Sequence, residues 1–403
     1  MRGRHLICLF FVLCLAVALV ATGCGKKEAP STGPATAEKT KEPVKIGGIF
    51  DLTGPTADVG QPYADGAKAY IDYLNSKGGV NGRQVELIDI DYAYDKTKAL
   101  EAYNKLVKQD QVAAILGWGT GDTEALKQMI AADKIPYISG SYSEGLLDIN
   151  LCPYNFLVAA SYSDQARIAL KWIKDNWKES RKPRVALIYN DTPFGKSPVA
   201  DAKKYAAQIG IDIVADEVVD LKALDATSQM LDLKQKKADF AIIQGTSNLA
   251  ATVLKDAKKN GLSTRFIGLN WAADEKVIKL AGPAAEGYIG VIPFAFPYEK
   301  VPGMAVIQEY LTAKGQKLEE KNQKFIQGWT SAMIMTEGIK RAGDKVTGEA
   351  IKAGLENLAN FDTGGLSAPV TFTAQSHRGS EKVRLAEVKN GRFEYLTDWI
   401  GYK

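Results

Sequence analysis

Histidine and cysteine are scarce in this sequence, with two and four copies among 403 residues. Beyond residue 24 only Cys152 and His377 remain, so that part of the chain can form neither an intrachain disulfide nor a cysteine-rich zinc cluster. The segment SYSEG (141–145) lacks one glycine of the G-x-S-x-G hydrolase elbow, and His377 is far from it in the sequence. We therefore expect that the protein is not an enzyme and that it binds neither a cofactor nor a metal.

A strong excess of charge is also lacking. The sequence has 51 Lys and Arg against 47 Asp and Glu, a formal net charge of +4, and Arg2 and Arg4 contribute two of these charges at the N-terminus. Because no strong basic field remains, nucleic acid is not expected as a partner. The run GWGTG (117–121) lacks the G-x-G-x-x-G spacing, and no complete G-x-x-x-x-G-K-[ST] loop is present, so nucleotide binding is not expected either.

The N-terminus carries an apolar run that is too short for a membrane span. Arg2 and Arg4 precede an unbroken apolar stretch from Leu6 to Val20, which small residues close. A membrane-spanning helix needs about 20 apolar residues. A positive head, a short apolar core and small residues are typical of a secretory signal peptide. We expect residues 1–23 to be this signal peptide.

The signal ends in VATGC (20–24), which resembles a bacterial lipobox. The resemblance implies that Cys24 is lipidated and becomes the first mature residue; an ordinary secretory signal with an incidental cysteine is the alternative. Residues 25–42 have no aliphatic side chain larger than alanine, so residues 24–43 are expected to be the lipid anchor and a flexible tether. This predicts an exported lipoprotein, in the periplasm or on the outer face of the cell membrane, that meets the membrane through its anchor only.

From Val44 onward, short apolar runs alternate with longer amphipathic stretches. VKIGGIF (44–50), RQVELIDIDYA (83–93) and VAAILG (112–117) are each followed by a helical pattern, and the rhythm restarts after residue 160. Repeated strand–helix units predict parallel, doubly wound α/β sheets. This length exceeds one typical core, so two lobes are expected. Near the C-terminus, Asn390-Gly391 predicts a hairpin between two strands.

Three loops that follow predicted strands carry small and hydroxyl side chains. They are FDLTGPTADVG (50–60), GWGTGDTEAL (117–126) and SGSYSEG (139–145). In open parallel sheets, ligands sit beyond the carboxyl ends of the strands, where helix N-termini point free N–H groups outward. These loops are therefore the candidate binding segments.

Three longer segments resemble the periplasmic leucine/isoleucine/valine-binding protein family, the substrate-binding proteins of branched-chain amino acid-type ABC transporters. They are residues 46–95, with NSKGGVNGR (75–83), residues 254–271 and residues 281–294. The resemblance runs from about Val44 to the C-terminus. It implies a type I periplasmic binding fold: two lobes, three hinge crossovers and a ligand in the interlobe cleft. We expect crossovers near Ala160, Val291 and Arg378, an N-terminal lobe of 44–160 plus 291–377, and a C-terminal lobe of 161–290 plus 378–403.

The resemblance also implies which positions contact the ligand. In the family, the ligand is held by a carboxylate-holding loop and a second loop of the first lobe, and by one aromatic residue and two strand-end loops of the second lobe. In this chain, these positions are Trp118, Gly119, Thr120, Ser141, Tyr142, Ser143, Phe194, Thr246, Ser247, Asn270 and Trp271. Trp118 and Trp271 could instead be core packing residues, and the serines and Thr120 could cap turns.

One position departs from the family pattern. The amino-acid binders of the family have an acidic residue that meets the ligand's ammonium group, and Asn270 stands there in this chain. A buried ammonium without a carboxylate partner is costly to desolvate. Asp274 and Asp51 are the candidates to replace the missing acid. Otherwise the ligand is expected to be a small carboxylate without an α-ammonium group, such as an aromatic acid.

The resemblance thus implies a receptor that passes a small solute to the permease subunits of an ABC importer. A branched-chain or other amino acid is the alternative ligand. A ligand sensor without transport and an enzyme on the same architecture are the alternative roles.

Overall fold

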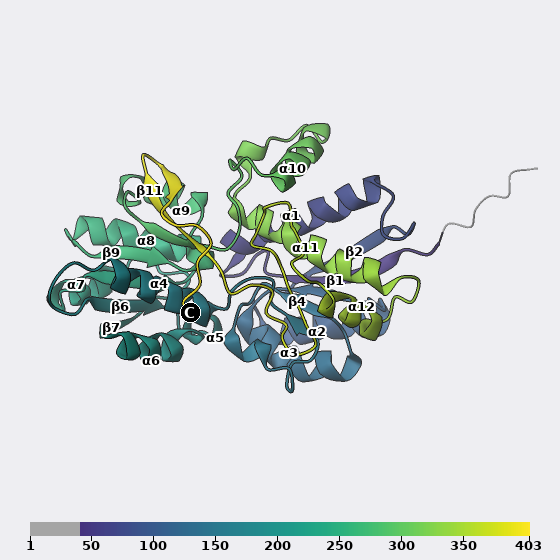
Figure 1. Cartoon of the computed structure of the whole chain (residues 1–403), viewed down its shortest axis with the longest axis horizontal. Helices are drawn as coiled ribbons and strands as arrows, with labels where there is room; N and C mark the ends of the chain where they lie inside the picture. The colour runs from purple at the N-terminus through teal and green to yellow at the C-terminus, as the bar shows by residue number, and fades with distance from the viewer. Residues whose placement is uncertain (1–40) are drawn as a thin grey trace, which may run out of the picture. The chain divides into compact units, whose positions relative to one another are not determined.

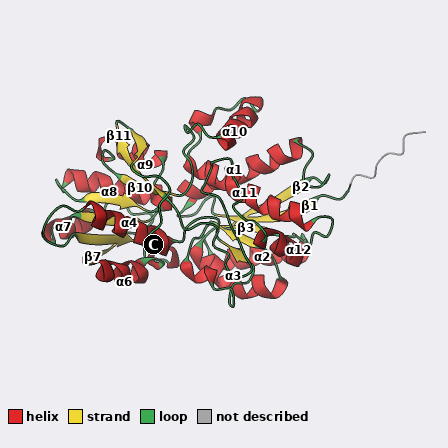
Figure 2. Cartoon of the chain, in the orientation of Figure 1, coloured by secondary structure: helices red, strands yellow, loops and turns green. Residues whose placement is uncertain are grey.

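The computed structural model describes residues 41–403, so the predicted signal peptide and Cys24 lie outside the described residues. The strands form two separate sheets, each with helices packed against it (Figure 2). None of the helices within residues 41–403 has both the length and the hydropathy needed to cross a bilayer. The predicted α/β class with parallel sheets is confirmed.

The first lobe contains a five-stranded parallel sheet in the order β2-β1-β3-β4-β5. Its strands are β1 (Val44–Phe50), β2 (Val85–Asp91), β3 (Ile115–Gly117), β4 (Tyr137–Ser139) and β5 (Asn155–Phe156). Its helices are α1 (Ala57–Ser76), α2 (Lys96–Asn104), α3 (Thr120–Asp133), α10 (Pro302–Ala313), α11 (Gln323–Ala342) and α12 (Gly348–Glu356). Helices α1, α11 and α12 form one layer, and α2 and α3 form another (Figure 1).

The second lobe contains a seven-stranded sheet in the order β12-β11-β10-β9-β8-β6-β7. Its strands are β6 (Arg184–Tyr189), β7 (Asp212–Val218), β8 (Phe240–Gln244), β9 (Arg265–Gly268), β10 (Ile289–Ile292), β11 (Arg384–Lys389) and β12 (Arg392–Tyr395). Its helices are α4 (Tyr162–Asn176), α5 (Pro193–Lys196), α6 (Val199–Ile209), α7 (Thr227–Gln235), α8 (Ser247–Lys259) and α9 (Glu275–Ala281). Strands β6 to β10 are parallel, whereas β11 and β12 form the antiparallel hairpin predicted at Asn390-Gly391.

The described chain passes between the two sheets three times. The first passage follows β5, and the second follows β10, which continues through Val291 to Ile292. The third lies between His377 and β11. The first and third passages run side by side, because Leu157 N donates to His377 O (3.0 Å) and Gly379 N donates to Leu157 O (2.7 Å). Two hydrogen-bonded backbone segments therefore form part of the connection between the lobes.

Helices α1 and α11 cross at very short range in the core of the first lobe. A Cβ atom added at Gly328 would lie 1.8 Å from Tyr63 O, and one added at Gly66 would lie 1.9 Å from Phe325 O. Trp329, the neighbour of Gly328, is fully buried. The two glycines thus allow the backbones to approach, and the adjoining aromatic side chains fill the space around them.

Candidate ligand-binding site

A small cavity of about 20 Å³ lies between the lobes, at the carboxyl ends of the strands. Its walls come from loops and helix starts of both lobes. The lining residues are Thr56, Val59, Tyr94, Trp118, Gly119, Thr120, Gly140, Tyr162, Phe194, Thr246 and Trp271. A volume of that size holds roughly one water molecule. A ligand as large as an amino acid therefore enters only if the lobes separate or the wall side chains move.

Two tryptophans, one from each lobe, meet in the cavity wall. The ring centroids of Trp118, from the first lobe, and Trp271, from the second, are 4.7 Å apart at an interplanar angle of 62°. Trp118 Nε1 donates to Thr56 Oγ1 (2.8 Å), and Trp271 Nε1 donates to the Tyr162 hydroxyl (2.9 Å). Because both indole N–H groups are satisfied, only the apolar ring surfaces face the cavity. The tryptophans predicted from sequence are thus wall residues of an aromatic pocket.

Hydroxyl groups gather where α3 begins. Helix α3 starts at Thr120, directly after the loop that follows β3, with Gly119 as its N-cap. Thr120 Oγ1 and Ser141 Oγ are 2.6 Å apart, and Ser143 N donates to Ser141 Oγ (3.3 Å). A helix N-terminus with a neighbouring hydroxyl is a favourable place for a carboxylate.

The structure brings six of the eleven predicted residues to the cavity wall: Trp118, Gly119, Thr120, Phe194, Thr246 and Trp271. The other five lie behind it, bound to other side chains. Ser141 pairs with Thr120, the Tyr142 hydroxyl accepts from Gln327, and Ser143 contacts Ser197. The Ser247 hydroxyl donates to the Asp274 carboxylate, and the backbone carbonyl of Asn270 accepts a hydrogen bond from the Lys324 ammonium. They support the wall rather than form its surface.

Neither acid proposed to replace the missing carboxylate faces the cavity. Asp51 accepts hydrogen bonds from Gly54 N and from both the amide and the hydroxyl of Thr56, at 2.6 to 2.8 Å. Asp274 caps α9 and accepts from Ser247 and Asn322. Both carboxylates are therefore committed to the protein's own groups, and none of the eleven lining residues is acidic.

Five lining residues were not singled out from the sequence: Thr56, Val59, Tyr94, Gly140 and Tyr162. Thr56, Val59 and Gly140 lie in the loops 50–60 and 139–145, which the strand-end rule had selected as segments, and the same rule applied to β2 would have found Tyr94. Tyr162 gives no such signal, because it opens α4 directly after the first passage between the lobes.

Lys324 is a buried lysine that sequence analysis also missed. It belongs to α11 of the first lobe, and its ammonium donates to Asn270 O (2.5 Å) and Ala273 O (3.2 Å) of the second lobe. Its Nζ lies 5.3 Å from the centroid of the Trp271 ring. Burial lowers the pKa of Lys324 to about 8. Lys324 thus fixes the loop that carries Trp271.

Asp122 lies beneath the cavity, in the first turn of α3. Its carboxylate accepts from Gly119 N (3.1 Å) and from the Tyr92 hydroxyl (2.9 Å). Burial raises the pKa of the Asp122 carboxyl from the usual 3.8 to about 6. The fold therefore places this carboxyl beneath the loop that carries Thr120, although burial disfavours its ionised form.

This raised pKa predicts an unusual pH dependence. Between pH 3.8 and about 6, the Asp122 carboxyl is protonated in the folded chain but ionised in the unfolded chain. The group therefore adds stability that is fully present below pH 3.8 and is lost as the pH rises through 6. In urea unfolding, the free energy of unfolding of the unaltered protein minus that of Asp122→Asn should fall by about 2–3 kcal/mol between about pH 3.5 and about pH 7.5. Asp65→Asn, at an exposed carboxyl of α1, should show no such change. A constant difference for Asp122→Asn would contradict the assignment.

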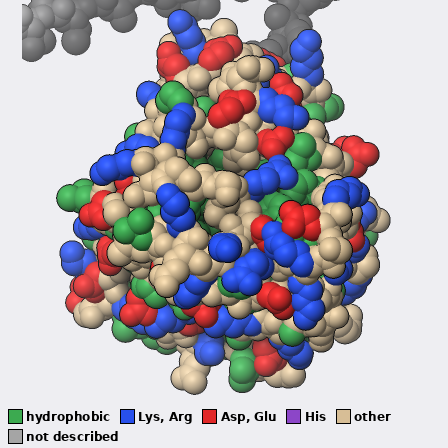
Figure 3. Space-filling model, turned by 90° about the vertical axis from the view of Figure 1, so that its left-hand side faces the viewer, with side chains coloured by type: hydrophobic (Ala, Val, Ile, Leu, Met, Phe, Trp, Pro, Cys, Tyr) green, Lys and Arg blue, Asp and Glu red, His purple; other side chains and the backbone are tan. Residues whose placement is uncertain are grey.

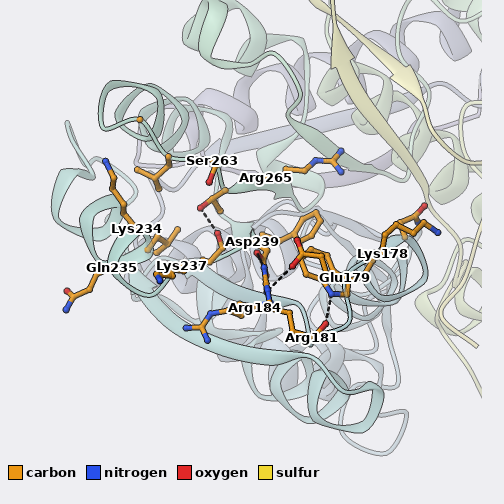
Figure 4. A pocket seen from close by; sticks show the side chains of 18 residues that line it. Lys178, Glu179, Arg181, Arg184, Lys234, Gln235, Lys237, Asp239, Ser263 and Arg265 are labelled. Atoms are coloured by element: carbon orange, nitrogen blue, oxygen red, sulfur yellow. Dashed lines mark hydrogen bonds and ion pairs between the residues drawn. The ribbon is translucent and has the colours of Figure 1, made fainter.

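A wider groove of about 1070 Å³ lies on the second lobe, where strands β6, β8 and β9 begin (Figure 4). Two of its arginines are already paired with acids: Arg181 binds Asp239 through both terminal guanidinium nitrogens (2.6 and 2.7 Å), and Arg265 binds Glu387 (2.8 Å). Figure 3 shows Lys and Arg interspersed with Asp and Glu on one face of the molecule. Within the described part of the chain, no group of three or more His, Cys, Asp or Glu could hold a metal. The interlobe cavity is therefore the candidate site.

Comparisons with known proteins find relatives that match most of the chain. A family model described as periplasmic binding protein matches residues 43–392. The leucine-, isoleucine-, valine-, threonine-, and alanine-binding protein of Pseudomonas aeruginosa is 24% identical over 335 residues, which are 83% of this chain and 88% of that protein.

Two solved structures are similar over nearly the whole chain. One is a branched chain amino acid ABC transporter protein from Thermus thermophilus with bound valine, with 28% identity, a TM-score of 0.85 and coverage of 90% of this chain and 97% of that one. The other is an ABC transporter substrate binding protein from Aeropyrum pernix, with 30% identity, a TM-score of 0.83 and coverage of 89% and 96%.

Proposed function

The chain belongs to the periplasmic binding protein family, and from this premise we propose that it is the substrate-binding protein of an ABC importer. It binds a small carboxylate between its lobes and presents it to the permease subunits. This role is non-catalytic. Export and lipidation at Cys24 are part of the proposal and rest on the sequence alone.

The composition of the cavity wall supports an anionic ligand with an apolar body. Thr120 and Thr246 each lie at the N-terminus of a helix, α3 and α8, whereas Trp118, Phe194 and Trp271 supply flat apolar surfaces. The helix N-termini and hydroxyls suit a carboxylate. The aromatic rings suit a hydrophobic or aromatic body.

The absence of an acid among the lining residues argues against an α-ammonium group on the ligand. An ammonium placed between Trp118 and Trp271 would meet ring faces and backbone carbonyls but no carboxylate from the eleven lining residues. The ligand we favour is therefore a small carboxylic acid without that group, such as an aromatic acid. A branched-chain amino acid is the second candidate, favoured by the relatives from Pseudomonas aeruginosa and Thermus thermophilus.

Matched ligand pairs test this choice by titration calorimetry. Leucine differs from 4-methyl-2-oxopentanoate, and phenylalanine from phenylpyruvate, in the replacement of the α-ammonium by a carbonyl. We expect the oxo acid of each pair to bind at least about tenfold more tightly, because it needs no acidic partner. Tight leucine binding without any response to the oxo acids would reject the ligand class and favour the second candidate. No binding of any of the four would count against the small-carboxylate function.

Thr120→Val should weaken binding of the preferred acid about a hundredfold. The variant removes the hydroxyl of a residue that lines the cavity, so a ligand carboxylate bound there would lose that donor in a desolvated place. Calorimetry with the same ligand would measure the loss. Thr97→Val, at an exposed threonine in the first turn of α2, is the matched control and should leave the affinity unchanged. Equal affinities for Thr120→Val and the control would remove Thr120 from the site.

A further inference from the structure

The N-terminus of α8 lacks the side-chain cap that a threonine at the N-cap position usually provides. Thr246 is the N-cap residue, and a threonine there normally accepts a hydrogen bond from the N–H of the second or third helical residue. Its side chain makes no such bond. Instead Thr246 Oγ1 is buried without a hydrogen-bond partner among the described residues, and Thr246 lines the cavity.

Asp58, from α1 of the first lobe, takes the place of that cap. Asn248 N, the second N–H of α8, donates to Asp58 Oδ2 (2.8 Å) across the two lobes. Lys276 Nζ, also from the second lobe, donates to Asp58 O (3.1 Å). A carboxylate at a helix N-terminus is favoured by both the free N–H groups and the helix dipole.

We propose that Asp58 is a positioning residue for ligand binding: it caps α8 across the closed lobes in place of Thr246, so that the Thr246 side chain stays at the cavity wall. The inference rests on the proposed function, because it assigns Thr246 to the ligand. When the lobes separate, Asp58 leaves α8, and Thr246 rotates to cap its own helix. Closure and the presentation of Thr246 are therefore one event.

The electrostatic surroundings of Asp58 fit a contact that can open. Burial raises the pKa of its carboxyl and Asp274 adds to this, whereas the Asn248 amide, Lys276 and Thr246 lower it. Desolvation is the largest of these effects, so the hydrogen bond to α8 only partly offsets the cost of burying the charge. The contact between Asp58 and α8 therefore adds little free energy to the closed form by itself. A bound ligand supplies the further free energy that closes the lobes fully.

Three variants test the proposal. Asp58→Ala removes the cap, Asp58→Asn keeps an acceptor without its charge, and Asp65→Ala removes an exposed carboxyl from the same helix as a control. The first measurement is small-angle X-ray scattering without ligand. Asp58→Ala should have a larger radius of gyration than the unaltered protein, Asp58→Asn a smaller increase, and Asp65→Ala none.

The second measurement is stopped-flow tryptophan fluorescence with 4-methyl-2-oxopentanoate and with leucine. Asp58→Ala should raise the dissociation rate constant about tenfold without lowering the association rate constant, because encounter occurs in the open form, which the variant populates at least as much as the unaltered protein. A merely structural role would lower the melting temperature without this split. If Asp58→Ala behaves like Asp65→Ala in scattering, or binds without the split, the proposal is wrong. If the unaltered protein binds neither compound, the proposed function is at fault, and the scattering result alone decides the role of Asp58.

Discussion

Replacing Arg378 with methionine is expected to lower the free energy of unfolding by about 3–5 kcal/mol. Arg378 lies on the third passage between the lobes, and its guanidinium donates to Asp164 Oδ2 (2.6 Å) and Glu144 Oε1 (2.5 Å). The Asp164 side chain has no solvent exposure. Burial raises the pKa of Asp164, and Arg378 is the first of the charges that lower it. Without Arg378, Arg167 (3.0 Å) is the cation that remains in contact with the Asp164 carboxylate among the described residues.

Chemical unfolding of both proteins at neutral pH measures this loss. Arg392→Met, at an exposed arginine of β12 that stacks on Tyr298, is the control and should cost less than about 1 kcal/mol. Adding Asp164→Asn to Arg378→Met should recover part of the loss, because it removes the buried charge left alone. An Arg378→Met variant as stable as the control would show that this ion network contributes nothing.

Gly328→Ala should also destabilise strongly, by about 3 kcal/mol, although alanine normally stabilises a helix relative to glycine by about 1 kcal/mol. The sign reverses because the new methyl group would lie 1.8 Å from Tyr63 O, so α1 and α11 must move apart. Thermal and urea unfolding would measure the effect. At Gly145, an exposed glycine where an added Cβ meets nothing within 4 Å, the same substitution should change stability by less than about 0.5 kcal/mol. If Gly328→Ala were as stable as the Gly145 control, α1 and α11 could move apart without a loss of stability, which would contradict this prediction.

Most of the fold was predictable because its signals are local. Apolar runs such as Val44–Phe50 become strands buried on both faces, as parallel sheets require, and Asn390-Gly391 adopts the positive φ angles of a tight hairpin turn. The role of Asp164 could not be read locally. Ser161 Oγ accepts from Asp164 N and caps α4, whereas the Asp164 carboxylate binds Arg378, which lies 214 residues away in the sequence.

The site was predictable only where it depends on strand ends. Trp118 and Thr120 follow β3, and they line the cavity. Ser141 has the right residue type, yet its hydroxyl is 2.6 Å from that of Thr120 and lies behind the wall. Asp58 and Lys324 act through contacts with the opposite lobe, separated from them by 190 and 54 residues, and no local pattern encodes such a pairing.

The two indoles that meet between the lobes have an optical consequence. Trp118 and Trp271 are 4.7 Å apart, close enough for their excited states to couple, and each belongs to a different lobe. The protein therefore carries its own exciton pair, whose circular dichroism couplet reports the separation of the lobes without any added label. Substituting phenylalanine at either position would abolish the couplet and identify it.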